Sequence, residues 1–387
     1  MILTLHQAPP LSLYIHLPWC IKKCPYCDFN SHEVPISGFD EKSYIDALIN
    51  DLEVELHRMR ERTISSIFIG GGTPSLFLPE SLDRLLSSIR SRLNLNSNIE
   101  ITLEANPGAV DTEKFLEYRA VGINRLSLGI QSFDNKSLAL LGRIHNSNEA
   151  KKAIEISKQS GFENFNLDLM FGLPNQTVDN ALADLKQAVE QLPTHISWYQ
   201  LTIEPNTVFS SNPPRLPNDD LVWSIQEQGQ IFLQDNNFRQ YEISAYARDN
   251  RVSIHNINYW QFGDYLGIGA GAHSKITNIA HGQIERFTRH KIPKRYIELA
   301  GYGDVITEKK VLTSDEIPLE FMMNALRLTD GVPIRFFSER TGLPIKNIEK
   351  ELGLAKKKGL LDWQKTELKP SFEGQRYLNE LLQIFMR

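Results

Sequence analysis

Three cysteines are the most distinctive chemical feature of this sequence. Cys20, Cys24 and Cys27 are the chain's only cysteines, and they lie in a C-x3-C-x2-C spacing within eight residues. Thiolates are the usual ligands of the irons in a [4Fe–4S] cluster, so three of them leave one iron open. The amino and carboxylate groups of S-adenosylmethionine (SAM) can chelate that iron. The spacing therefore predicts a cluster that binds SAM and cleaves it by one-electron reduction.

A zinc site is the alternative use of these cysteines, with His16 or His32 as a fourth ligand. Structural zinc usually takes paired ligand spacings, and no second pair follows here, so the spacing favours the cluster. An odd, clustered set of cysteines is also a poor disulfide framework. Such a set fits a compartment that keeps thiols reduced, and we expect a cytoplasmic location.

Further candidate residues follow later apolar runs of the chain. The segment 70–74 (GGGTP) lacks the lysine of a phosphate loop, but its glycines would let backbone carbonyls approach the SAM amino group. Glu104, Gln131 and Asp168 lie at the ends of later runs, and Arg143 can pair with a carboxylate in bidentate geometry. None of these residues indicates a site by itself, so the prediction depends on whether the fold brings them to one face.

The elements that must position these residues are strands that alternate with amphipathic helices. Such alternation predicts parallel βαβ units, and six units favour an α/β fold with a partial, open (βα)6 barrel. The carboxyl ends of barrel strands form the active face, which would collect all the candidate residues. The expected strands are residues 11–16, 65–70, 99–104, 125–130, 165–170 and 196–203.

The rest of the chain predicts two smaller parts after a barrel over residues 1–240. Residues 241–305 form an extension that contains 255–274, a stretch rich in aromatic residues and glycine without helical periodicity. Residues 306–387 read as helix, short helix, helix, β-ribbon and final helix, an order similar to a winged-helix module.

Charge and hydropathy argue against several classes of function. The net charge of −5 gives no broad attraction to nucleic acid, and we expect no nucleic-acid partner. No apolar run reaches the length of a membrane-spanning helix, and the start lacks the pattern of a signal peptide. Peripheral association with a membrane stays open.

The motifs together resemble the HemN/HemW group of radical SAM proteins. The resemblance rests on YIHLPWCIKKCPYC, IGGGTPS, LEANP, LSLGIQSF, LGRIH, LDLMFGLP and HNINYW, which occur in order from residue 11 to about 275. It implies a radical SAM barrel with the group's C-terminal domain. By similarity, Tyr14, Gly71 and Glu104 would contact the cluster-bound SAM. The pocket for a second SAM, as bound in the oxygen-independent coproporphyrinogen oxidases, would be lined by Tyr26, Gly72, Thr73, Gln131, Arg143 and Asp168. Thr202 matches a further SAM-contact position of the group.

One position separates two functions within the group. The decarboxylating oxidases carry CxxxCxxCxC, whereas Phe29 stands here in place of the last cysteine. The sequence therefore resembles the HemW-type heme chaperones more closely. That resemblance implies binding of heme and its delivery to hemoproteins such as respiratory enzymes, an electron donor for the cluster, and a homodimer. A coproporphyrinogen III dehydrogenase is the alternative, and an RNA-modifying radical SAM enzyme is a weaker one.

His255 is the candidate heme ligand, because it opens the HNxxYW motif and histidine is a common axial ligand of heme iron. Tyr259 and Trp260 of the same motif could stack against a porphyrin. A core histidine that hydrogen-bonds to backbone is the alternative interpretation, with the two aromatic residues as packing.

Overall fold

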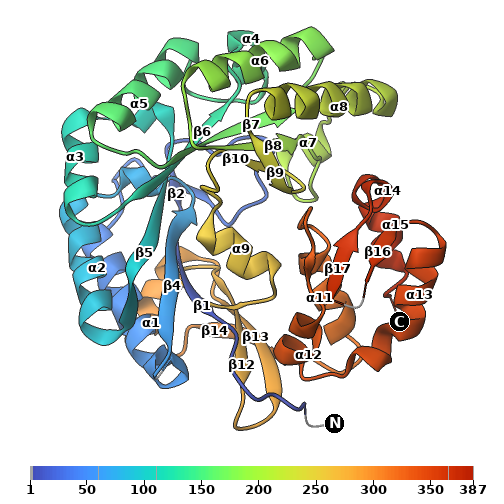
Figure 1. Cartoon of the computed structure of the whole chain (residues 1–387). Coiled ribbons are helices and arrows are strands. Elements are labelled where there is room, and N and C mark those ends of the chain that lie inside the picture. Colours follow the sequence, from blue (N-terminus) through green and yellow to red (C-terminus); the bar gives the residue numbers. More distant parts are fainter. Residues whose placement is uncertain (1–2, 60, 110, 365, 387) are drawn as a thin grey trace.

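Six parallel strands form the centre of the computed structural model, which describes residues 3–59, 61–109, 111–364 and 366–386. Figure 1 shows them as a curved sheet with helices along its outer side. The expected partial (βα)6 barrel is thereby confirmed. The strands are β1 (Leu11–Leu17), β4 (Thr63–Gly71), β5 (Asn94–Ala105), β6 (Arg125–Gln131), β7 (Phe165–Phe171) and β8 (His195–Gln200).

The outer helices follow from their caps and their apolar faces. Asp40 accepts a hydrogen bond from the amide of Ser43 at 2.9 Å at the start of α1, and Asn146 forms a capping box with Glu149 at the start of α5. In α1, Ile45, Leu48 and Leu52 face the sheet and are fully buried. The helices that cover the barrel are α1 (Glu41–Met59), α2 (Pro79–Arg92), α3 (Thr112–Ala120), α4 (Asn135–Leu140), α5 (Ser147–Gln159), α6 (Val178–Glu190), α7 (Val208–Ser211) and α8 (Asp219–Asp235).

The sheet continues past the barrel on both sides. The strand order is β14-β13-β12-β11-β1-β4-β5-β6-β7-β8-β10-β9, so the sheet stays open between β14 and β9. Residues 264–311 thus extend the barrel sheet beside β1, which local periodicity did not indicate. The added strands are β9 (Arg239–Glu242), β10 (Ala245–Ala247), β11 (Asp264–Ile268), β12 (His273–Asn278), β13 (Gln283–Arg289) and β14 (Ile306–Val311), with α10 (Pro293–Ala300) before the last.

One stretch expected to lack helical structure contains a helix. Residues 254–260 form α9 (Ile254–Trp260), capped by Ser253, whose hydroxyl accepts a hydrogen bond from the amide of Asn256. Only His255 and Asn258 of this helix are buried, three residues apart, so the helix is too short to show a clear apolar period. The absence of a helix was therefore a wrong prediction.

The tail forms a second, mainly helical unit with its own core. It contains the three-stranded sheet β15-β17-β16, and its core also includes Leu3, Leu5 and Phe262. The helix, helix, helix, hairpin order matches the winged-helix-like expectation. The elements are α11 (Ile317–Ala325), β15 (Val332–Pro333), α12 (Arg335–Thr341), α13 (Glu349–Lys357), β16 (Leu361–Trp363), β17 (Glu367–Pro370), α14 (Phe372–Arg376) and α15 (Leu378–Gln383). Within the described residues, no helix is both long and apolar enough to cross a membrane.

Candidate functional site

The three cysteines lie on a loop that leaves the carboxyl end of β1. Two short parallel strands, β2 (Trp19–Cys20) and β3 (His32–Glu33), close the base of this loop. Cys20 is buried, Cys24 and Cys27 are partly exposed, and all three thiols are free. The loop therefore presents three unbonded thiols at the strand ends, as the sequence predicted.

Polar groups surround these thiols. Arg143 donates from Nη1 to Cys24 Sγ at 3.5 Å, and the hydroxyl of Ser31 lies 3.6 Å from Cys27 Sγ. Burial raises the pKa of the Cys20 thiol, and a hydrogen bond with Thr73 acts in the opposite direction. Hydrogen-bond donors beside sulfur stabilise a negatively charged thiolate site. The donor set therefore fits an anionic iron–sulfur cluster.

The histidines considered as zinc ligands have other partners. His16 Nδ1 lies 2.9 Å from Tyr14 Oη, and its Nε2 lies 2.8 Å from the backbone oxygen of Asn30. His32 Nε2 lies 3.2 Å from the backbone oxygen of Lys291. In the described part of the chain, no three His, Cys, Asp or Glu side chains converge to hold one metal ion. A [4Fe–4S] cluster needs a different arrangement, because each thiolate binds a different iron.

The glycine-rich turn packs tightly against the cysteine loop. A Cβ at Gly72 would lie 2.5 Å from the backbone oxygen of Trp19, and one at Gly71, where φ is +122°, would lie 2.7 Å from the His16 ring. The amide of Thr73 also donates to the Trp19 oxygen at 2.7 Å. These glycines therefore permit a close approach between β4 and the loop itself, a role that the sequence did not reveal.

Two half-buried carboxyl groups, Glu104 on β5 and Asp168 on β7, lie on the barrel strands that flank β6. Glu104, near the end of β5, accepts a hydrogen bond from the amide of Gly71 at 3.1 Å. Burial raises the pKa of Glu104 to about 7, and the charge of Asp168 adds to the effect. Asp168 accepts hydrogen bonds from Ser127 and Asn166. Asp168 is the fourth of seven residues in β7, so its expected place at the strand end was wrong.

Gln131 and Arg143 converge over Gly129. A Cβ at Gly129 would lie 3.3 Å from Gln131 Nε2 and 3.4 Å from Arg143 Nη2. Gln131 ends β6 with φ of +68°, an unfavourable backbone conformation for a residue other than glycine. Tyr26, on the cysteine loop, is hydrogen-bonded to Arg143 and packs on Phe209. The structure thus brings Tyr26, Gln131 and Arg143 to the same side of the cysteines.

Thr202 lies apart from this group in its contacts. It follows β8, is exposed, and its hydroxyl donates to the backbone oxygen of Gln200 at 3.4 Å. No described contact joins it to the other predicted SAM residues.

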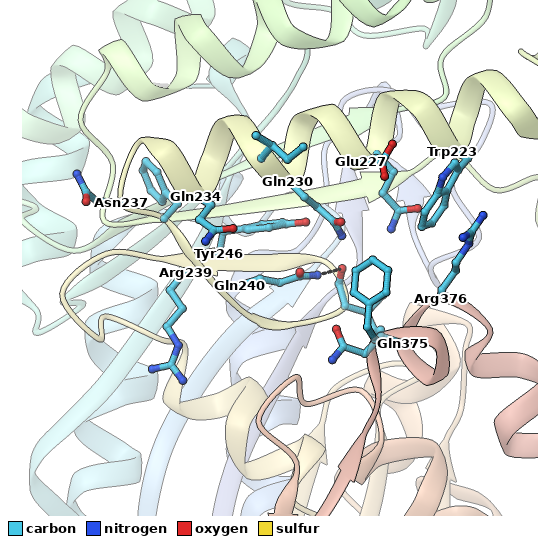
Figure 2. A pocket seen from close by; sticks show the side chains of 15 residues that line it. Trp223, Glu227, Gln230, Gln234, Asn237, Arg239, Gln240, Tyr246, Gln375 and Arg376 are labelled. Carbon is cyan, nitrogen blue, oxygen red and sulfur yellow. Dashed lines mark hydrogen bonds between the residues drawn. The ribbon is translucent and has the colours of Figure 1, made fainter. Parts of the chain in front are cut away.

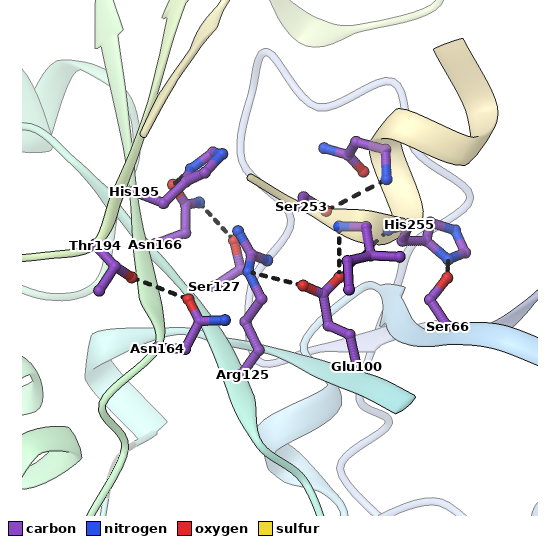
Figure 3. A network of polar contacts seen from close by, with 12 residues as sticks. Ser66, Glu100, Arg125, Ser127, Asn164, Asn166, Thr194, His195, Ser253 and His255 are labelled. Atoms are coloured by element: carbon purple, nitrogen blue, oxygen red, sulfur yellow. Dashed lines mark hydrogen bonds and ion pairs between the residues drawn. The ribbon is translucent and has the colours of Figure 1, made fainter. Parts of the chain in front are cut away.

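His255 lies inside the barrel, in the polar network of Figure 3. Its Nδ1 lies 3.1 Å from Ser66 Oγ, and its ring packs at 5.1 Å from Phe68. Burial, with the charge of Arg125 second, lowers its pKa to about 3, so the imidazole is neutral. Neutral imidazole is the form that ligates iron.

The aromatic residues of the HNxxYW motif face elsewhere. Tyr259 contacts Tyr265, and the guanidinium of Arg327 lies 4.4 Å from the Trp260 ring centroid. No described ring contact joins either residue to His255. The motif therefore does not form one continuous porphyrin-facing surface in this structure.

The sequence reasoning missed two residues with structural roles, the buried Arg125 and the half-buried Asn30. Arg125 lies within the barrel, 3.8 Å from a Glu100 oxygen, and Asn30 ties the cysteine loop to residues 270 and 291. Neither belongs to a spacing pattern, because their partners are distant in the sequence. No local signal could have found them.

A groove of about 700 Å³ lies between α8, the β9–β10 hairpin and α14. Figure 2 shows Trp223 beside Arg376, whose guanidinium lies 3.9 Å from the indole centroid and links the tail to the barrel. Most of the polar wall is glutamine, and no cysteine, histidine or methionine lines it. The groove is thus separate from the cysteine loop.

Comparisons with known proteins agree with this geometry. The chain matches the radical SAM superfamily over residues 14–188 and the HemN C-terminal domain over residues 312–377. It is 50% identical to the heme chaperone HemW of Haemophilus influenzae and 46% identical to HemW of Escherichia coli, in both cases over 98% of this chain and 99% of the relative. The solved structure of coproporphyrinogen III oxidase (HemN) from Escherichia coli, a radical SAM enzyme, superposes with a TM-score of 0.82 at 22% identity. The superposition covers 98% of this chain and 90% of the HemN chain.

Proposed function

Because the chain belongs to the HemW family of radical SAM proteins, we propose that it is a heme chaperone. In this proposal it holds a [4Fe–4S] cluster, SAM and heme, and it delivers heme to hemoproteins such as respiratory enzymes. The observation that carries the proposal is the loop with three free thiols beside Arg143, Thr73 and Ser31.

Cys20, Cys24 and Cys27 would hold the cluster, which when bound supplies one electron for cleavage of SAM. Arg143 donates a hydrogen bond to Cys24 Sγ and places positive charge beside the proposed cluster. The packed turn at Gly72 holds the end of β4 against the loop. The third experiment below tests whether SAM is cleaved in the working cycle or acts only as a switch.

We propose that Glu104 binds polar groups of the cluster-bound SAM. Glu104 lies next to Gly71 and can accept from an amino group or from ribose hydroxyls. Its raised pKa shows that burial alone disfavours the charged form, so a cationic ligand group would restore that charge. Tyr14 completes this first SAM site. The residues proposed for a second site are Tyr26, Gly72, Thr73, Gln131, Arg143 and Asp168, with Thr202 as a further SAM contact.

We propose His255 as the heme ligand. A porphyrin coordinated there has to approach from within the barrel, because Nδ1 faces Ser66 and only Nε2 is available. The free thiols also support a cytoplasmic location, where such groups stay reduced. A homodimer and peripheral membrane association are further parts of the proposal.

The first experiment tests the cluster. Anaerobically reconstituted protein should contain iron and sulfide in a four-to-four ratio, and each of Cys20→Ala, Cys24→Ala and Cys27→Ala should remove most of both. Ser210→Ala, a change on α7, serves as a control that should retain the cluster. Zinc in place of iron, or an intact cluster in all three variants, would contradict the assignment.

The second experiment tests heme. The purified protein should bind heme, and His255→Ala should alter the heme spectrum, whereas His57→Ala, on the exposed face of α1, should not. An unchanged spectrum in His255→Ala would remove His255 as a ligand and direct attention to the groove of Figure 2.

The third experiment separates the chaperone from the dehydrogenase. Incubation with coproporphyrinogen III, SAM and reductant should leave the porphyrinogen unchanged. Formation of protoporphyrinogen IX, detected by mass, would overturn the chaperone proposal. The same reaction, analysed for 5′-deoxyadenosine, decides whether SAM is cleaved.

A further inference from the structure

We propose that the exposed rim of the cysteine loop is the docking surface for an acidic one-electron carrier protein. The rim consists of residues 20–36 and 290–298. The inference rests on the proposed cluster and names the kind of protein that reduces it.

Both segments of this rim carry large apolar side chains that are exposed. The exposed fractions of Phe29, Ile292 and Ile36 are 62%, 63% and 110%, and Ile21 is 48% exposed. Exposed apolar residues that cluster, unlike those scattered singly, mark interaction sites. Phe29 occupies the position where the decarboxylating oxidases have another cysteine, so this apolar centre is a point of difference from them.

The two segments of the rim form one fixed surface. Asn30 donates from Nδ2 to the backbone oxygen of Lys291 at 2.8 Å, and His32 Nε2 lies 3.2 Å from the same oxygen. Lys23 donates from Nζ to the backbone oxygen of Phe29 at 3.0 Å. Because these bonds hold the backbone, the apolar side chains are presented without a cost of ordering the loop on binding.

The charge of the rim opposes that of the whole protein. Its two segments carry five Lys and Arg against three Asp and Glu, a local charge of +2 in a chain of −5. Among the described residues, the ammonium groups of Lys22, Lys291 and Lys294 form no hydrogen bond or ion pair. An acidic protein is therefore repelled by the chain as a whole and attracted at this rim, which orients its approach.

The chemistry of reduction explains why the rim lies here. One electron leaves the reduced carrier and enters the cluster, and no bond or proton is exchanged. Cys24 and Cys27 belong to the rim and are partly exposed, so a carrier bound there is close to the site it reduces. An anionic membrane surface would also favour cationic and apolar residues. The position of the rim over the cysteines favours the carrier.

The test compares two variants with the same change of charge. Lys22→Glu combined with Lys291→Glu alters the rim, and Lys357→Glu combined with Lys358→Glu alters exposed residues at the end of α13. The probe is an acidic plant-type [2Fe–2S] ferredoxin at low ionic strength. We expect the rim variant to be reduced at least ten-fold more slowly than the α13 variant, and the wild-type rate to fall with added salt.

Two further measurements keep the outcomes distinct. Reduced methyl viologen, a small cation, should reduce the rim variant at least as fast as wild type; failure to reduce even wild type would contradict the cluster instead. Titration of cluster-free protein with ferredoxin should show weaker binding only for the rim variant. Equal binding and equal reduction in both variants, or a loss confined to binding of phosphatidylglycerol vesicles, would overturn the proposal.

Discussion

Substitution of Asn30 tests whether tertiary contacts hold the cysteine loop in place. Its amide Nδ2 donates to the backbone oxygens of Ala270 and Lys291, both at 2.8 Å, and Gly271 leaves the space that this amide fills. Asn30→Ala removes both bonds. At about 1 kcal/mol for each bond, the loop would open about 2 kcal/mol more easily.

That free energy has a kinetic consequence. If loss of the cluster requires local opening of the loop, its rate follows the population of the open form. A change of about 2 kcal/mol raises that population by roughly 30-fold, because 1.4 kcal/mol corresponds to a factor of ten. We therefore expect an iron chelator to remove the cluster roughly 30-fold faster from Asn30→Ala than from wild type.

The assay is the decay of visible absorption after addition of chelator under anaerobic conditions. Asn96→Ala, an exposed asparagine at the opposite end of the barrel strands, is the matched control and should decay at the wild-type rate. Asn30→Asp should decay at least as fast as Asn30→Ala, since a carboxylate cannot donate to the two carbonyls. Decay of Asn30→Ala at the wild-type rate would refute the reasoning.

Three other predictions concern stability. Asp184 accepts hydrogen bonds from the Ser132 hydroxyl and the Phe133 amide, and burial raises the pKa of Asp184 from 3.8 to about 6. As pH rises, Asp184 therefore loses its proton in the unfolded chain before it does so in the folded protein. Ionisation of this group thus lowers the free energy of unfolding as pH rises from about 4 to 7. Asp184→Asn should remove this dependence, and the change in unfolding free energy between pH 5 and 7 should differ from wild type by about 1 kcal/mol in denaturant titrations. Gly72→Ala should displace the cysteine loop, because the added Cβ would meet the Trp19 backbone. We expect the free energy of unfolding to fall by about 1–3 kcal/mol and the iron content to fall as well. Unchanged stability and iron content would contradict the packing argument. Gly229→Ala should lower the melting temperature, because its Cβ would lie 1.9 Å from the Trp198 ring, whereas Gly353→Ala, in open space on α13, should raise it slightly.

Local patterns were sufficient for much of the fold. The six strands follow from the β-rich runs, and the helices between them follow from their amphipathic faces. The order of the tail elements also followed from periodicity. The helix α9 was missed, because seven residues with two buried side chains give too weak a period.

The sequence likewise indicated one part of the candidate site and gave no sign of the other. The cysteine spacing and the glycine turn were visible in the sequence, since their chemistry depends on neighbours along the chain. The approach of Glu104 to Asp168 depends on the register of β5 and β7 across β6, which no single segment reports. The approach of Gln131 to Arg143 depends on how the loop after α4 folds back over β6. The burial of His255 beneath Phe68 was equally hidden, because α9 inserts into the barrel from a distant part of the chain.

The sequence by itself therefore determined the class of the barrel and which cysteines are proposed as cluster ligands, since ligand spacing and hydrophobic period are local properties. The tertiary structure alone decided how the loop is held, through Asn30, and which groups surround it, because contacts between residues 240 or more positions apart depend on the register of the whole sheet.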